Sequence, residues 1–256
     1  MDLYAFAPIA ALLELASTAV NGLASLFTPL SGASAMALAI VALTVLVRIC
    51  LIPLGAAQAR AEVTRRRIAP KLRELQTRHK KNPEKLQRAT LELYAEEKSS
   101  PFAGMLPALA QAPVLSIVYG LFILTTINGH PNELLHETLL GVPLGASFFS
   151  VVNGSAAWPG AAVFLGLFAV IAAVAYTSRR VMLAQQAQST EEMPAAMARV
   201  SGVLSWMPFI TVIFAAIVPL AATLYLTVTT AWTLGERQIL RRRAERQASF
   251  TESTTS

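Results

Sequence analysis

Charge is distributed unevenly along this chain, and that distribution restricts the fold more than any other feature of the sequence. Twelve of the 21 lysines and arginines fall in residues 58–98, three in residues 178–202 and five in residues 236–256, and long apolar stretches separate these segments. Only 14% of the residues are charged, whereas a soluble domain carries roughly 25%. This pattern predicts a polytopic membrane protein and argues against a sequence-specific nucleic-acid-binding protein, whose basic residues would not be divided in this way.

Five segments are apolar over the length of about 20 residues that a transmembrane helix needs. The last two are separated only by Pro219, and we expect a tight hairpin there, because one helix of about 33 residues would overspan a bilayer of roughly 30 Å. We therefore predict an all-α fold with five transmembrane helices and a cytoplasmic helical hairpin. The predicted spans are residues 34–54, 105–127, 160–177, 203–218 and 220–235.

The basic segments also predict the orientation of these helices, because cytoplasmic loops of membrane proteins are enriched in lysine and arginine. A topology with the N-terminus outside and the C-terminus inside places residues 58–101, 178–202 and 236–256 in the cytoplasm, together with 20 of the 21 basic residues. Residues 128–159 contain no lysine or arginine and are predicted to form an extracytoplasmic loop.

Residues 1–33 allow two interpretations. They lack the basic N-terminal region of a secretory signal peptide. They form either a sixth span or an amphipathic helix on the outer membrane surface, and a sixth span would bury Glu14 near its centre at a cost of about 3 kcal/mol. We therefore expect an extracytoplasmic amphipathic segment.

Residues 58–101 are expected to form the cytoplasmic hairpin. Apolar residues recur at helical spacing over residues 58–80, Asn82 and Pro83 interrupt the pattern, and a second helix is expected from Pro83 to Lys98. Because the apolar content is low and the charge is dense, we expect a mobile, hydrated hairpin with few core residues.

The sequence contains no motif of an enzyme. It has no phosphate-binding glycine-rich loop and no serine nucleophile elbow, and the single cysteine, Cys50, has no partner for a disulfide or a metal site. We predict no catalytic residue, no metal and no cofactor, and hence an activity that does not depend on nucleotide hydrolysis.

Arg48 lies about two-thirds along the first predicted span, where a charge costs from about 2.5 to above 10 kcal/mol. Arginine cannot lose its proton, and no other predicted span supplies a carboxylate. The side chain therefore either reaches the cytoplasmic headgroups or faces a polar cavity inside the protein. Thr44, one turn earlier on the same face, and Gln111, in the second predicted span, favour the cavity.

Several short motifs occur in order along residues 34–240. They are Thr44 to Arg48 with Pro53 and Gln58, Pro70 to Gln76 with Asn82 to Leu86 and Tyr94, Pro101 to Pro107 with Gln111 to Pro113 and Tyr119, and Met207 to Phe209 with Pro219, Tyr225 and Trp232. Together these motifs resemble the Oxa1/YidC/Alb3 family of membrane protein insertases. No large extracytoplasmic domain precedes them, which is more similar to the short Gram-positive or actinobacterial members.

The resemblance implies a function and a site. In this family five helices enclose a hydrophilic groove that opens to the cytoplasm and to lipid, and an arginine in the groove transiently holds the polar tail of a client. The resemblance therefore implies a multi-pass insertase and chaperone in the plasma membrane of a bacterium, with nascent membrane proteins as its clients. It assigns Arg48, Thr44 and Gln111 to the groove. On the fifth predicted helix, Leu226, Thr229 and Thr230 differ from the residues that relatives often carry.

The basic segments have two interpretations. The resemblance implies contacts with the ribosome, the signal recognition machinery or the general Sec translocon, whereas charge alone predicts orientation in the membrane and binding of anionic lipids. The candidate contact residues are Arg78, Lys80, Lys81, Arg241, Arg242 and Arg243.

Two other functions remain open at this point. A small transporter or channel would also place a charge inside the membrane, but the internal repeats that are common in transporters are not evident. A structural assembly factor would pack against other membrane proteins without any polar groove.

Overall fold

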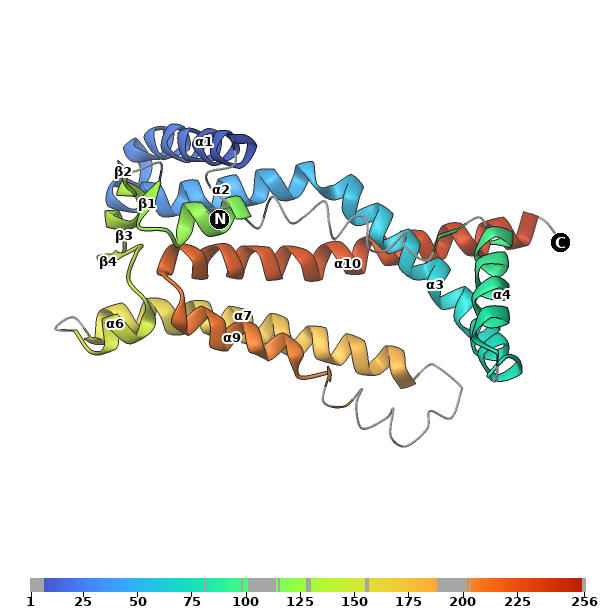
Figure 1. The fold of residues 1–256 in the computed structure, drawn as a ribbon. Helices are drawn as coiled ribbons and strands as arrows, with labels where there is room; N and C mark the ends of the chain where they lie inside the picture. The colour runs from blue at the N-terminus through green and yellow to red at the C-terminus, as the bar shows by residue number, and fades with distance from the viewer. Residues whose placement is uncertain are drawn as a thin grey trace. The chain divides into compact units, whose positions relative to one another are not determined.

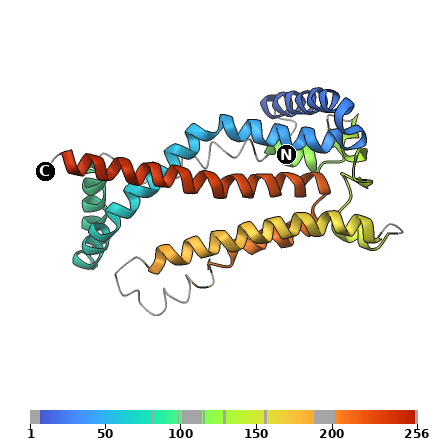
Figure 2. The same cartoon turned by 180° about the vertical axis from the view of Figure 1, so that it is seen from behind.

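The computed structural model describes residues 7–80, 82–97, 99–100, 114, 116–127, 130–154, 157–187, 202 and 204–254. The chain divides into two compact units, and most of the described residues in both are helical (Figure 1, Figure 2). The first unit comprises Met1–Arg48 and Pro113–Leu234, and the second comprises Ile49–Ala112 and Gly235–Ser256.

The first unit contains long helices joined by a folded loop (Figure 1). Two of its helices, α2 and α10, continue into the second unit. The elements are α1 (Ala7–Ser31), the 3-10 turn η2 (Gly32–Ser34), α2 (Ala35–Cys50), a helical stretch at residues 116–122, β1 (Thr126–Ile127), β2 (His130–Pro131), η3 (Glu133–His136), β3 (Thr138–Leu139), β4 (Val142–Pro143), α6 (Phe148–Val152), α7 (Ala157–Ala187), α9 (Met207–Ile217) and α10 (Leu220–Thr254).

A reversal of the chain at Gly32 connects α1 to α2 (Figure 1). Gly32 has a φ of +52°, a left-handed conformation that glycine adopts without steric cost. Both helices contribute to one apolar cluster, in which Leu13 and Val20 of α1 and Ile40 of α2 are fully buried. The reversal therefore brings side chains of both helices into one apolar cluster instead of extending one long helix.

Three different faces run along α1. One face contributes buried side chains such as Leu13 and Val20. The second carries exposed polar residues at intervals of four, three and four, namely Glu14, Thr18, Asn21 and Ser25. The third carries leucines that are between 42% and 83% exposed, namely Leu12, Leu15, Leu26 and Leu30. Separate protein-facing, polar and apolar faces are typical of a helix that lies at an interface.

Residues 130–154 form a compact segment, which we call the cap. In and beside it, β1 pairs antiparallel with β2, and β3 with β4. Leu140 and Gly141 both have positive φ and form the two-residue turn between β3 and β4. The helical character of the predicted fold is confirmed, and these four strands of two residues each are the departure from the predicted all-α fold.

The cap binds the first turn of α10. The N–H groups of Leu220 and Ala221 donate to the carbonyl oxygens of Ala146 and Leu144 at 2.8 and 2.9 Å. These bonds satisfy two of the four N–H groups that the start of a helix leaves unpaired. Within the cap, Gly145 allows its backbone to lie close to Leu135, since a Cβ at residue 145 would be only 2.9 Å from the carbonyl oxygen of Leu135.

The helix α7 packs against α6 and α9 (Figure 1). Phe148 of α6 makes edge contacts with Phe164 and Phe168 of α7, at ring-centroid distances of 5.8 and 5.3 Å. The helix α9 ends at Ile217, and α10 then runs back in the opposite direction (Figure 1). The last two predicted segments are therefore two helices joined by a reversal at Pro219.

Several helix ends differ from the predicted segments. The first ends at Cys50 instead of residue 54, because Pro53 lacks an N–H group and its ring would clash with the preceding turn. In the second segment the helix ends at residue 122, and Thr126–Ile127 is a strand. The helices α7 and α10 continue beyond residues 177 and 235, because good helix formers follow without proline or glycine.

Two helical stretches of the described chain are long and apolar enough to cross a membrane, Pro8–Cys50 and Trp158–Ala184. The first contains the reversal at Gly32 and therefore both α1 and α2. Met207–Ile217 is apolar but shorter. The count of five spans, their orientation and the assignment of the intervening segments stay predictions.

The second unit contains α3 (Ile52–Arg78), α4 (Pro83–Glu96) and the C-terminal part of α10. The helices α3 and α4 form a hairpin, in which the Asn82 side chain caps α4 by accepting a hydrogen bond from the Lys85 N–H at 3.0 Å. Ile68 of α3 and Leu93 of α4 are buried, while most other side chains of the hairpin are exposed. The small core agrees with the low apolar content of this segment.

Candidate functional site

Arg48 lies near the C-terminal end of α2, about 20 Å along the helix axis from Ala35. The exposed apolar side chains of α2 share one side of the helix, and Leu46 among them is 52% exposed. At about 100° per residue, Arg48 projects about 160° away from Leu46 and only about 40° from the buried Thr44. Arg48 is therefore on the side of α2 that faces protein, not on its exposed apolar side.

Thr44 is 5% exposed, and its hydroxyl donates to the Ile40 carbonyl oxygen at 2.7 Å. This bond satisfies the hydroxyl within its own helix. The sequence placed Thr44 on the same face as Arg48, and the helix geometry agrees. Its burial shows that Thr44 packs against protein, and its assignment to a groove stays a prediction.

The Arg48 side chain is partly exposed, and within the described part of the chain no carboxylate forms an ion pair with it. A guanidinium always carries its charge and presents five N–H donors in a planar fork. A fixed charge on the protein-facing side of an apolar helix, with no counter-charge among the described residues, favours binding of an anionic group that comes from another molecule.

The first part of α10 carries threonines that the sequence analysis did not assign to a site. The Thr223 hydroxyl donates to the carbonyl oxygen of Ala215 on α9 at 2.9 Å, and the Thr227 hydroxyl donates to the carbonyl oxygen of Thr223 at 2.8 Å. The Thr229 hydroxyl is buried and has no hydrogen-bond partner among the described residues. A buried hydroxyl without a partner lowers stability by on the order of 1–3 kcal/mol. Binding of a polar group from another molecule would therefore be favoured there. The signal in the sequence was five threonines within residues 223–233.

The other predicted site residues have these positions. Arg78 ends α3, and Lys80 follows it in an exposed turn. Residues 241–243 lie in α10, but the description does not extend to the side chains of Arg241, Arg242 and Arg243. Gln111 and Lys81 lie outside the described residues. The described residues contain no group of three histidine, cysteine, aspartate or glutamate side chains that could hold a metal ion.

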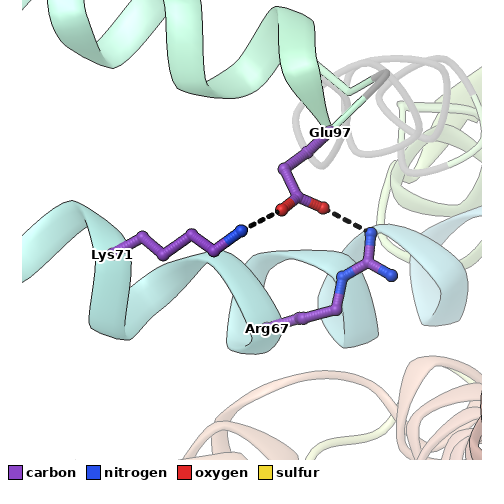
Figure 3. A network of polar contacts seen from close by, with 3 residues as sticks. All are labelled: Arg67, Lys71 and Glu97. Atoms are coloured by element: carbon purple, nitrogen blue, oxygen red, sulfur yellow. Dashed lines mark hydrogen bonds and ion pairs between the residues drawn. The ribbon is translucent and has the colours of Figure 1, made fainter.

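Glu97 joins the two helices of the hairpin through an ion-pair network (Figure 3). Its carboxylate accepts hydrogen bonds from Lys71 Nζ at 2.7 Å and from Arg67 Nη2 at 2.6 Å. The hydrogen bond from Lys71, together with the charge of Arg67, lowers the pKa of the Glu97 carboxyl, and partial desolvation opposes this shift. The sequence did not reveal this contact, because Glu97 follows its partners by 26 and 30 residues.

Comparison with known proteins identifies the family. The family model described as 60Kd inner membrane protein matches residues 26–247. Similar proteins include the chloroplastic inner membrane ALBINO3-like protein 2 of Chlamydomonas reinhardtii, 29% identical over 79% of this chain and 49% of the relative. The membrane protein insertase YidC of Streptomyces avermitilis is 26% identical over 85% of this chain and 55% of the relative. The membrane protein insertase YidC of Clostridium perfringens is 34% identical over 48% of this chain and 52% of the relative.

The chain spans about half the length of these curated relatives. The family match nevertheless includes α2, α3, α4, α7 and α9 completely, and so it contains Arg48 and the hairpin. The family that the sequence motifs predicted is confirmed. This chain belongs to the 60Kd inner membrane protein family, the membrane insertase family of Oxa1, YidC and Alb3.

Proposed function

We propose that this protein inserts nascent membrane proteins into the bilayer and assists their folding. One observation carries the proposal: Arg48 projects from the protein-facing side of an apolar helix and has no ion-pair partner among the described residues. Family membership supports it, since the relatives in Streptomyces and Clostridium are named membrane protein insertases.

Arg48 lowers the barrier that the polar tail of a client meets in the membrane. A carboxylate that crosses hydrocarbon loses its hydration at a high energetic cost. In a hydrophilic groove beside α2, the guanidinium offers charge-assisted hydrogen bonds part-way across. A single hydrated ion pair is weak enough to release the tail afterwards. Transfer of the client's apolar helix into lipid then supplies the free energy, without nucleotide hydrolysis.

The proposed location is the plasma membrane of a bacterium, with several spans, the N-terminus outside and the C-terminus inside. The cap contains no lysine or arginine, which suits the outer side, whereas the basic hairpin suits the cytoplasm. The three faces of α1 support a helix on the outer surface, with Leu15 and Leu26 toward lipid and Glu14 toward water.

The basic residues beyond the membrane are proposed contacts for other components. Arg78 and Lys80 are exposed at the end of α3, and residues 241–243 continue α10 with three arginines. Clustered arginines and lysines bind ribosomal RNA phosphates and anionic lipids through the same charge, so both are proposed partners. The signal recognition machinery and the Sec translocon are proposed on the family resemblance alone.

The test uses a strain depleted of its own insertase and a single-span client with an acidic extracytoplasmic tail. We expect Arg48→Ala to lower insertion by about tenfold or more, equivalent to about 1.4 kcal/mol, and Arg48→Lys to retain most of it. The matched control is Arg237→Ala, which removes an exposed positive charge from α10. A client whose acidic residues are replaced by amides should lose its dependence on Arg48. Full insertion of the acidic client by Arg48→Ala would contradict the proposal.

A further inference from the structure

One stripe of exposed side chains runs along α7 from Trp158 to Leu183. Trp158 is 85% exposed at one end, Leu165 is 53% exposed in the middle, and Tyr176 is 47% exposed further on. Trp158 and Tyr176 lie about 27 Å apart along the helix axis, close to the roughly 30 Å thickness of a bilayer core. Tryptophan and tyrosine gather at the two membrane surfaces, so these two residues mark the limits of the lipid-facing part of α7.

Arg180 follows Tyr176 by one turn on the same exposed stripe. Its Nε and Nη2 donate to the Tyr176 hydroxyl at 2.9 and 2.6 Å, and its guanidinium carbon lies 5.1 Å from the centre of the Tyr176 ring. These contacts hold the guanidinium beside the Tyr176 hydroxyl, at the aromatic boundary itself. That boundary borders the level of the lipid phosphates, which a guanidinium there can reach.

The neighbouring Arg179 is held by the start of α9. Its guanidinium carbon lies 4.3 Å from the centre of the Trp206 ring, and its Nε donates to Ser205 Oγ at 3.4 Å. Ser205 is 1% exposed and in turn donates to the Gly202 carbonyl oxygen at 2.7 Å. Two consecutive guanidinium groups are therefore fixed by aromatic and hydroxyl partners. Within the described chain neither forms an ion pair with a carboxylate.

We propose that Arg179 and Arg180 form a binding site for the phosphate of an anionic phospholipid, at the membrane surface where α7 emerges. Charge complementarity supports this occupant, because two oriented guanidinium groups match a phosphate and its negatively charged oxygens. The apolar surface supports a lipid instead of a free ion. Trp206 and Met207 beside the site are 55% and 56% exposed, and the exposed stripe of α7 continues from it. The site is independent of the proposed insertion of clients.

The experiment measures lipid selectivity at Trp206. A protein with Trp206 as its only tryptophan, obtained by Trp158→Phe and Trp232→Phe, is reconstituted into phosphatidylcholine vesicles. Increasing fractions of brominated phosphatidylglycerol or brominated phosphatidylcholine then quench its fluorescence at short range. The ratio of the two quenching curves gives the preference for the anionic lipid, and we expect phosphatidylglycerol to be preferred.

The variants separate an oriented site from general attraction. Arg179→Gln and Arg180→Gln should each lower the preference by about fivefold, as expected for one arginine at a charged surface, and the double variant should abolish it. Tyr176→Phe keeps both charges but removes the hydroxyl that orients Arg180, and should lower the preference by about twofold. The matched control, Arg60→Gln with Arg65→Gln, removes two exposed arginines from α3 that have no proposed binding role, and should change nothing.

Three results would overturn the proposal. The double variant at residues 179 and 180 retains the preference, the control variant at Arg60 and Arg65 loses it equally, or inorganic phosphate at millimolar concentration removes it. The last result would identify a site for a free anion. Circular dichroism and recovery of each variant in vesicles ensure that the quenching refers to folded protein.

Discussion

The cap and the hairpin are two connecting segments of this chain that are stabilised in opposite ways. The cap buries Leu134, Val142 and Leu144, and its backbone carbonyls bind the first turn of α10. In the hairpin, Ile68 and Leu93 are buried, and the ion pairs of Glu97 join its two helices. Apolar burial contributes far more per residue than an exposed ion pair does. We infer that the cap unfolds together with the first unit, whereas the hairpin opens by itself.

The largest expected effect concerns the core of the cap. Leu144 is completely buried, and Leu144→Ala should lower the free energy of unfolding by about 2–5 kcal/mol, because it leaves a cavity. Leu140→Ala is the matched control, since Leu140 is 74% exposed in the same loop. The free energy of unfolding of both variants is measured in mixed micelles with increasing dodecyl sulfate, with tryptophan fluorescence as the signal. Equal stability of the two variants would remove the basis for the comparison.

A smaller effect is expected at Asn132, which is buried in the cap. Its amide nitrogen donates to the carbonyl oxygens of Leu121 and Leu124, both at 2.9 Å, and so satisfies the end of the helix at residues 116–122. Asn132→Ala leaves both carbonyls without this donor and should cost about 1–3 kcal/mol in the same unfolding assay. Asn153→Ala, at an exposed position, should change stability little. A cap whose stability survives Asn132→Ala depends on burial alone.

The effect of Glu97→Gln should be confined to the hairpin. Spin labels at Ala61→Cys in α3 and Ala95→Cys in α4, in a Cys50→Ser background, report the distance between the two helices. Glu97→Gln weakens the bonds to Arg67 and Lys71, so the distance distribution should become broader and longer, while the midpoint of global unfolding stays the same. Glu92→Gln is the control, because Glu92 pairs with Arg88 of its own helix. A shift of the global midpoint would show that the hairpin is coupled to the remainder of the chain.

The smallest expected effect is the response of the hairpin to pH. The folded pKa of Glu97 is lowered from its ordinary value of 4.5. Its contribution to hairpin stability is therefore present above about pH 4.5 and lost as the pH falls through the lowered pKa. The spin-label distance of the unsubstituted hairpin should increase in that acidic range, whereas Glu97→Gln should respond less. Identical pH curves would show that other carboxyls control the opening.

Much of the helical framework was predictable because apolar length and proline positions determine it. Pro219 separates α9 from α10, and Asn82 and Pro83 begin α4, as local rules suggest. The ends of α7 and α10 were not predictable from hydropathy, because helix formation continues through polar residues after the apolar stretch ends. Likewise, the strands of the cap depend on tertiary packing, and their two-residue length leaves no periodic signal.

The candidate site was predictable from the sequence only where a single residue is chemically unlike its neighbours. Arg48 is conspicuous because a charge in an apolar helix is costly. Thr44 was placed on the correct face by helical periodicity, but its burial and its bond to Ile40 required coordinates. The pairing of Arg179 with Trp206 joins residues 27 positions apart, and that of Lys71 with Glu97 joins residues separated by 26. Such contacts have no local signature.

If α7 spans the membrane as proposed, its aromatic residues also restrict motion along the membrane normal. If α7 moves in one direction, the amphipathic ring of Trp158 enters hydrocarbon, and if it moves in the other, the ring of Tyr176 does. The helix is therefore held at a fixed depth. Because α9 packs on α7 and its N-cap residue Trp206 holds Arg179, α9 shares that depth. In the proposed insertion of clients, this pair of helices is a stationary reference past which a client helix slides.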